Sequence, residues 1–295
     1  MRYILVGTGH MGQRYLELND SRLQGVVRAR AALGSGKRGV PAYFTIKEAL
    51  SKSGAEAALI ASPLEHHFDH ALEALECGAH VLVEKPLCRS SDEWRALQEI
   101  AERKGLKLKS ALPLRHHPVW HRFIEEARRL PQPLKLGFTL LQPLDIVKKE
   151  RLKLYSPFLD IAPHYLDISL QILGECASLK TEALQSTEWV RSTLLYPDGS
   201  EAALEFAWSE KLQPRAERFA CGGGRRLSLE FDGLTRLTLD GTLLSAEEPG
   251  WSRLLRRQLD DFFEGENYDP LEGKRVELLE RGESELYLNG KVEVV

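Results

Sequence analysis

A glycine pattern directly after the first apolar segment is the feature that most constrains the fold. Residues 2–7 read RYILVG and residues 6–12 read VGTGHMG, so three glycines follow the run in the spacing G-x-G-x-x-G. In a strand–turn–helix unit, such glycines permit a tight turn, a close approach to a pyrophosphate and close helix–strand packing. The N-terminus of the helix also attracts an anion. The pattern predicts a dinucleotide site whose candidate contacts are Gly7, Thr8, Gly9, His10, Met11 and Gly12.

The first 110 residues continue as short apolar runs that alternate with helical patterns, which is typical of a parallel α/β sheet. The expected strands lie at residues 2–7, 25–29, 57–61, 80–84 and 106–110. A capping box predicts a helix between Ser90 and Gly105. We therefore expect an N-terminal Rossmann domain with a doubly wound parallel sheet.

After residue 130 the pattern changes to a two-residue alternation of apolar and polar side chains. It covers residues 134–142, 186–209 and 225–246, with Pro-Asp-Gly and Asp-Gly turns between the runs. Helical patterns follow at 252–265 and 271–287. We expect a C-terminal α+β domain with a large open, mainly antiparallel sheet, so that the domains are 1–118 and 119–295.

Composition excludes several classes of protein. A net charge of −3 argues against a general binder of nucleic acid or anionic membranes. No apolar run approaches the roughly 18 residues that span a bilayer. The first residues enter the folded pattern at once, and the four cysteines are scattered without metal-ligand spacing. These features favour a reduced, cytoplasmic compartment and no bound metal.

The end of the second expected strand bears on cofactor choice. NAD sites usually have an acidic residue there, about 20 residues after the glycines, that binds the ribose 2′-hydroxyl. This chain has no Asp or Glu from Gly25 through Phe44. Cationic and hydroxyl side chains suit a 2′-phosphate instead and favour NADP over NAD, although an exposed basic loop is the alternative. The candidate residues are Arg28, Arg30, Ser35, Lys37 and Arg38.

Residues 61–87 read ASPLEHHFDHALEALECGAHVLVEKPL, in the order strand, turn, helix, strand. Ligands of open parallel sheets bind at the carboxyl ends of the strands, so Lys85 is expected to face the cofactor. A solvated charge is the alternative for Lys85, and a cap or packing role for His67. The candidate cofactor contacts of this segment are Ser62, Pro63, His67, Glu84 and Lys85.

The stretch FLDIAPHYLD, residues 158–167, contains Asp160, His164 and Asp167 where a helix begins. Read alone, Pro163 starts the helix, Asp160 caps it and His164 lies on its polar face. Alternatively, these residues are proton-handling groups of an active site. Three further histidines, at 116, 117 and 121, lack an acidic partner at helical spacing and do not indicate a metal site.

Several motifs together resemble the glucose–fructose oxidoreductase/inositol dehydrogenase (Gfo/Idh/MocA) family. They are GTGHMG, the segment ending in EKPL, RHHP at 115–118, LDIAPHYLD and, more loosely, residues 271–291. The resemblance implies a Rossmann domain and a C-terminal α/β domain whose open sheet often mediates homo-oligomerisation. It also implies NAD(P)-dependent oxidation of sugars, polyols or related hydroxyl compounds, or the reverse reduction.

The resemblance implies that Lys85 corresponds to the lysine of the family's EKP motif. It also implies that Asp160 and His164 correspond to the family's D-x-x-x-H pair. One departure lies just before the aspartate, where the family commonly has glycines and this chain has LYSPFLD. We expect Tyr155, Pro157 and Phe158 to form a bulkier wall there.

Hydride transfer from a carbinol requires the hydroxyl proton to leave and the developing alkoxide to be stabilised. A histidine titrates at about pH 6.5, so His164 is the natural base for oxidation or acid for reduction. The Lys85 ammonium can hydrogen-bond to the reacting oxygen. Asp160 can orient His164 or bind a neighbouring substrate hydroxyl.

The sequence therefore predicts an NADP-preferring dehydrogenase or reductase that acts on CH–OH donors of small molecules. A reductase of C=C or C=N bonds, similar to biliverdin reductases, is the second hypothesis. A non-catalytic dinucleotide-binding sensor is the third, because the altered wall could close the site.

Overall fold

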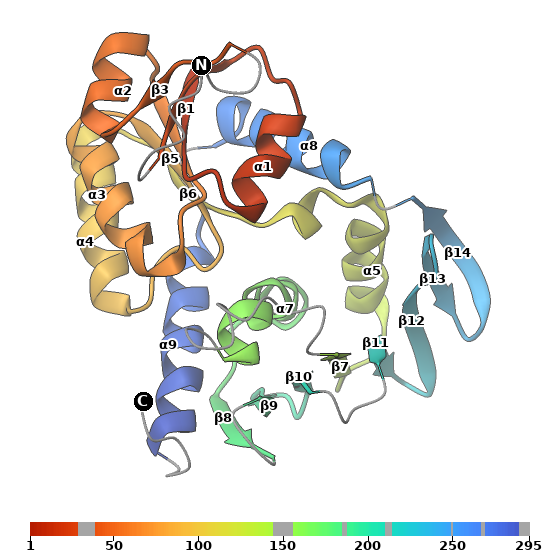
Figure 1. Cartoon of the computed structure of the whole chain (residues 1–295). Coiled ribbons are helices and arrows are strands. Elements are labelled where there is room, and N and C mark those ends of the chain that lie inside the picture. The colour runs from red at the N-terminus through yellow and green to blue at the C-terminus, as the bar shows by residue number, and fades with distance from the viewer. Residues whose placement is uncertain are drawn as a thin grey trace. The chain divides into compact units, whose positions relative to one another are not determined.

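The computed structural model describes residues 1–28, 39–143, 156–184, 188–209, 214–248, 250–266 and 269–288 (Figure 1). The chain forms two compact units. Unit 1 comprises Met1–Pro113 with Gly250–Val276, and unit 2 comprises Leu114–Pro249 with Glu277–Val295. The division into domains at residue 118 stays a prediction, and it did not anticipate the assignment of Gly250–Val276 to unit 1.

Unit 1 contains a parallel sheet with the strand order β3-β2-β1-β4-β5-β6 in its described part. The order reverses direction between β1 and β4, which confirms the expected doubly wound topology. The strands are β1 (Tyr3–Val6), β2 (Leu23–Val27), β3 (Ala42–Tyr43), β4 (Ala57–Ile60), β5 (His80–Glu84) and β6 (Leu108–Ala111). The helices are α1 (His10–Glu17), α2 (Ile46–Ser53), α3 (His67–Glu76), α4 (Ser91–Lys104), α8 (Trp251–Glu264) and the start of α9 (Glu272–Leu288), with a 3₁₀ turn η1 (Leu64–His66).

The central strands are apolar throughout because both faces of the sheet are buried. On β4, Ala58 and Ile60 join one apolar core, which also contains Trp94 of α4. Ala57 and Leu59 join the other, which includes Leu259 of α8. The two-residue period of a strand thus assigns alternate side chains of one apolar run to opposite faces.

Helix α4 has the ends that its sequence predicts. Ser90 Oγ accepts a hydrogen bond from the Glu93 backbone N–H at 3.2 Å, and Gly105 ends the helix at φ +66°. Helix α2 uses the same device, with the Thr45 side chain accepting from Glu48 N. Helix α2 and the two-residue strand β3 before it were not predicted from the sequence.

Unit 2 contains a mainly antiparallel sheet, in the order β14-β13-β12-β11-β7-β10-β9-β8 over its described part. This confirms the predicted fold class, with one addition: β7 and β10 are parallel. A parallel pair requires a crossover connection, and helix α7 lies in the chain between these strands. The strands are β7 (Lys135–Gln142), β8 (Ser178–Ala183), β9 (Trp189–Leu195), β10 (Glu201–Trp208), β11 (Arg215–Gly222), β12 (Arg225–Phe231), β13 (Thr235–Leu239) and β14 (Thr242–Glu247).

Two helices of unit 2, α5 (Pro118–Arg129) and α7 (Pro157–Leu173), pack against each other, and α7 also lies against β9 and β10 (Figure 1). Aromatic rings form the centre of this packing. The Tyr165 ring of α7 stacks on Phe138 of β7 at 4.9 Å and on Phe206 of β10 at 5.6 Å. The segment after His164 is therefore fixed to the sheet.

Within the described residues, no helix is both long and apolar enough to cross a membrane. All four cysteines are free thiols.

Candidate active site

Three turns at the carboxyl edge of the unit 1 sheet form the candidate cofactor site. They follow β1, β4 and β5, which are neighbours in the sheet. Gly7 has φ +93°, and a Cβ there would lie 2.6 Å from both Ala61 O and Ser62 N. Only glycine therefore lets the β1 turn touch the β4 turn, at the point where the strand order reverses.

Helix α1 begins beside these turns. A Cβ on Gly12 would lie 2.2 Å from Gly7 O, so the close packing of helix on turn requires glycine. Gly9 is the N-cap and provides no side-chain bond, while the first helical turn carries no acidic residue. A Cβ on Gly9 would meet no atom within 4 Å. A bare helix N-terminus with open space beside it fits a dinucleotide pyrophosphate.

The remaining residues of the glycine motif flank this N-terminus. Thr8 O accepts a hydrogen bond from Gln13 Nε2 at 3.0 Å, which links the turn to the second turn of α1. His10 and Met11 are the first two residues of the helix. Their contact with a cofactor stays a prediction.

The predicted 2′-phosphate contacts follow β2. Arg28 is half-buried directly after the strand, and its backbone N–H donates to Tyr43 O at 3.3 Å. The predicted residues Arg30, Ser35 and Lys37 lie outside the described residues, as does Arg38.

His67 connects two of the three turns. Its side chain is buried, with Nδ1 2.8 Å from Pro86 O and Nε2 2.9 Å from Ser62 O. Burial lowers the pKa of His67, although both carbonyls oppose this shift. The ring thus ties the β4 turn to the backbone next to Lys85, which favours the packing alternative over direct contact with the cofactor.

The other residues of the β4 turn lie nearer the surface. Ser62 Oγ is 2.9 Å from His70 Nδ1, and Pro63 is exposed. His66 is exposed beside His70, with 5.6 Å between the ring centroids.

Glu84 ends β5 and is buried among polar partners. Tyr15 OH donates to Glu84 Oε1 at 2.9 Å, and Gln258 Nε2 donates to Tyr15 OH at 2.8 Å. Burial, followed by the Glu84 carboxylate, raises the pKa of Tyr15, so its hydroxyl stays a donor. This chain of bonds links α1, β5 and α8 and fixes the end of the strand that precedes Lys85. Lys85 itself is half-buried and follows β5 directly, before a cis Lys85–Pro86 bond.

In unit 2, helix α7 starts earlier than the sequence predicted. Ser156 is the N-cap, because its Oγ accepts from Leu159 N at 3.0 Å, and Pro157 is the first helical residue. Asp160 therefore lies inside the first turn, so its predicted capping role was wrong. Pro163 lies inside the helix and does not start it.

Asp160 and His164 stand out on α7 because the residues around them are buried. Both are half-exposed, whereas residues 157–159, 161–163 and 165–170 are buried. Their spacing of four residues puts the two side chains on one face of the helix. The structure thus brings this predicted pair together on one half-exposed face of a mostly buried helix.

The predicted wall before Asp160 is not formed by Phe158. This ring is fully buried and packs on α9, where a Cβ on Gly282 would lie 2.4 Å from it. Pro157 is also buried, Ser156 Oγ hydrogen-bonds to Glu283, and Tyr155 lies outside the described residues. Phe158 supplies core packing, because the helix starts at Pro157 and this ring lies against α9.

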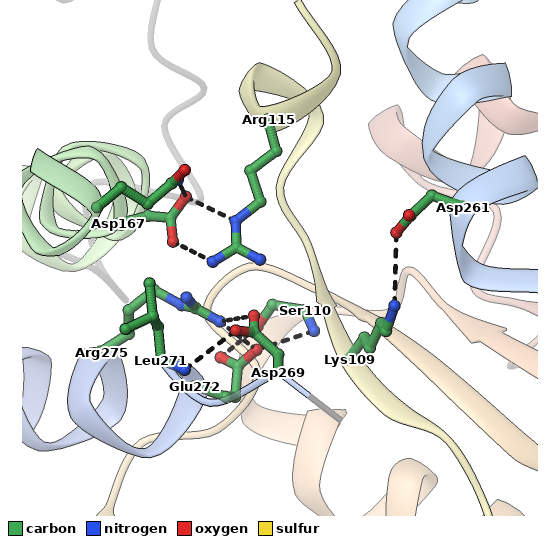
Figure 2. Close-up of polar contacts among 10 residues, drawn as sticks. Lys109, Ser110, Arg115, Asp167, Asp261, Asp269, Leu271, Glu272 and Arg275 are labelled. Carbon is green, nitrogen blue, oxygen red and sulfur yellow. Dashed lines mark hydrogen bonds and ion pairs between the residues drawn. The ribbon is translucent and has the colours of Figure 1, made fainter. Parts of the chain in front are cut away.

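Asp167 is held by an arginine of the RHHP motif (Figure 2). Arg115 Nε and Nη2 donate to its two carboxylate oxygens at 2.8 and 2.5 Å, and Gln171 Nε2 donates at 2.8 Å. Asp167 is buried. The pair anchors α7 to the segment before α5, and this accounts for Asp167 without a substrate.

His117, the second histidine of the motif, caps α5 by accepting from Val119 N, and its Nε2 lies 3.1 Å from Thr235 Oγ1. No group of three or more His, Cys, Asp or Glu residues is arranged to hold a metal ion in the described part of the chain.

A second buried ionic cluster lies at the end of β6 in unit 1 (Figure 2). Glu272 accepts from Ser110 N at 3.1 Å and Ser110 Oγ at 2.7 Å, and Arg275 Nη2 binds both Glu272 and Asp269. Every member has a charged or hydrogen-bonding partner, so the cluster fixes the start of α9 to the sheet.

Residues 1–111 match the model of the Gfo/Idh/MocA family, described as an oxidoreductase family with an NAD-binding Rossmann fold. The match covers 111 of the 295 residues and lies within unit 1. A curated relative in this group, D-xylose 1-dehydrogenase (NADP(+)) 2 of Haloferax volcanii, is 36% identical over 98 residues, which are 33% of this chain and 30% of that protein. The chain covers between 18% and 61% of the length of eight curated relatives that it matches.

Likeness to solved structures extends over nearly the whole chain. UDP-N-acetylglucosamine 3-dehydrogenase GnnA from Acidithiobacillus ferrooxidans has a TM-score of 0.81 at 21% identity, with 98% of both chains covered. Biliverdin reductase from Synechocystis, solved with biliverdin and NADP+, has a TM-score of 0.81 at 16% identity, covering 97% and 99%. At these identities the likeness shows the fold.

Three supporting residues were not predicted from the sequence: Tyr15, Arg115 and Ser156. Ser156 had a local signal, since serine before proline is a common helix start. Tyr15 and Arg115 act through partners 69 and 52 residues away, which no local pattern reveals.

Proposed function

We propose that the protein is an NADP-preferring oxidoreductase that transfers a hydride to or from a sugar, polyol or related hydroxyl or carbonyl compound. The observation that carries the proposal is the carboxyl edge of the unit 1 sheet. The bare N-terminus of α1 and the half-buried Lys85 follow β1 and β5, which flank β4. This arrangement pairs an anion site with a cationic donor at one sheet edge.

When bound, a nicotinamide cofactor supplies the acceptor or donor of the hydride. In the oxidation, the C–H bond of the carbinol breaks and the hydrogen leaves as a hydride with both bonding electrons. The O–H proton passes to His164. The Lys85 ammonium donates a hydrogen bond to the same oxygen and stabilises the negative charge that develops on it. Asp160, one helical turn before His164, orients the imidazole or holds an adjacent hydroxyl. Reduction uses the same groups with the proton moving from His164 to oxygen.

The proposed chemistry uses the side chains of Lys85, Asp160 and His164. A panel of sugars, polyols and bilins, followed by oxidation or reduction of the nicotinamide, tests it against the pigment-reductase alternative. Turnover of hydroxyl or carbonyl compounds supports the proposal, whereas turnover of bilins alone would favour C=C or C=N reduction. Dinucleotide binding without any turnover would favour the sensor hypothesis.

The preference for NADP is supported by the basic sequence after β2 and the absence of an acidic residue from Gly25 through Phe44. We expect Arg30→Ala to weaken NADPH binding by about tenfold or more and to leave NADH binding unchanged. Equal effects on both cofactors would contradict the preference. We further propose that the protein is located in the cytoplasm and forms homo-oligomers through its C-terminal sheet.

A further inference from the structure

Arg218 is a cation whose nearest neighbours on one face of the unit 2 sheet are apolar. It lies on β11 directly opposite Phe138 of β7, and Phe138 in turn pairs with Leu204 of β10. Phe138, Leu204 and Ala220, two residues after Arg218, are all fully buried. Paired residues on adjacent strands share a face, so the Arg218 side chain extends over this apolar surface.

The guanidinium has one hydrogen-bond acceptor in the described part of the chain. Arg218 Nε donates to Tyr165 OH at 3.1 Å. Its Nη1 is buried from solvent and has no hydrogen-bond partner. No carboxylate forms an ion pair with Arg218 in the described part of the chain, whereas the buried Arg275 and the half-buried Arg115 each bind carboxylates. A guanidinium in apolar surroundings without an anion is costly unless another group satisfies it.

The position of this cation relates it to the proposed reaction. Tyr165, which receives the Nε bond, directly follows His164 on α7 and is fixed between Phe138 and Phe206. The guanidinium is thus hydrogen-bonded to the residue that follows the proposed proton-transfer residue, His164, on α7. Its Nη1 donor is held in place before any ligand binds.

We propose that Arg218 is a specificity-determining residue that binds an anionic substituent, a carboxylate or a phosphate, on the substrate. This inference deepens the proposed function and rests on it for the identity of the reaction. A planar guanidinium matches the oxygens of either anion, and an anion would supply both the missing acceptor and the missing charge. A neutral sugar hydroxyl would supply only an acceptor.

The test measures equilibrium binding to the full-length protein, so that it does not depend on turnover. The probes are D-glucose, D-glucuronate and D-glucose 6-phosphate, which share a ring and differ at carbon 6. Calorimetric titrations compare the wild type with Arg218→Met, Arg218→Lys and the control Arg215→Met. Arg215 lies on the same strand but is exposed and paired with Glu217.

We expect at least one of the two anions to bind the wild type more tightly than glucose does. The anion that binds more tightly shows whether Arg218 prefers a carboxylate or a phosphate. Arg218→Met should raise the Kd of that anion by about 10- to 100-fold and leave the Kd of glucose unchanged. Arg218→Lys should restore part of the preference, and Arg215→Met should keep all of it. Thermal unfolding of each variant separates loss of binding from loss of folding.

Equal binding of glucose and both anions to the wild type would overturn the inference, as would full anion affinity in Arg218→Met. Lack of turnover with every probe would count against the proposed function instead, because the binding preference would remain measurable.

Discussion

Alanine at position 9 is expected to weaken dinucleotide binding while leaving the fold intact. Gly9 is the N-cap of α1 with φ −69° and ψ −157°, a conformation that alanine adopts without strain. A Cβ there would meet no atom of the protein within 4 Å. The added methyl group would instead occupy the space in which we expect the pyrophosphate.

The expected stability change is small because two effects offset each other. Replacing glycine reduces the entropy of the unfolded chain and stabilises by about 0.4–1 kcal/mol. Alanine is a poorer N-cap than glycine, which costs a similar amount of about 1 kcal/mol at most. Loss of one charge-assisted bond to phosphate corresponds to about 1.5–3 kcal/mol of binding energy, or roughly 10- to 100-fold in Kd.

The assay combines a fluorescence titration with NADPH and a denaturant unfolding curve for Gly9→Ala. Gly12→Ala is the companion variant, since its Cβ would lie 2.2 Å from Gly7 O and should lower the unfolding free energy by about 1–3 kcal/mol. A Gly9→Ala protein that binds NADPH as tightly as the wild type would refute the assignment of the site.

Two further predictions concern buried groups of unit 1. Because burial lowers the pKa of His67, the folded protein binds this proton less than the unfolded chain does, and stability should fall as the pH drops below about 6.5. Urea unfolding across pH 5–8 should show a smaller loss in His67→Asn; an identical pH dependence would contradict this. Lys107→Met should lower the unfolding free energy by about 2–3 kcal/mol, since Nζ donates to the carbonyls of Phe262, Phe263 and Gly265. The exposed Lys135→Met is the control, and equal effects in both variants would remove the claimed role of Lys107.

Local signals predicted much of the fold. The glycine spacing located α1, the capping box located α4, and the change from helical to two-residue periodicity located the second sheet. These features are encoded within about ten neighbouring residues, where sequence patterns are informative. Helix α2 had a similar signal at Thr45 and Glu48 but was not singled out.

The parallel pairing of β7 and β10 could not be read in this way, because strand patterns do not specify partners distant in the chain. For the same reason no local pattern predicted the hydrogen bond between Glu84 and Tyr15 of α1, since Glu84 was predicted only as a cofactor contact. The role of Phe158 was misjudged because its exposure depends on Gly282, more than 120 residues later. Because α7 starts at Pro157, Asp160 lies inside its first turn and does not cap the helix.

The most direct test of the proposed function is the rate of substrate-dependent nicotinamide reduction by the wild type, Lys85→Ala, His164→Ala and the control His121→Ala. His121 is an exposed histidine of α5, so its loss should not affect the rate. We expect kcat to fall by about 10²-fold or more in Lys85→Ala and in His164→Ala, with NADP binding little changed in His164→Ala. A kcat at the wild-type level in both of these variants would contradict the proposed chemistry.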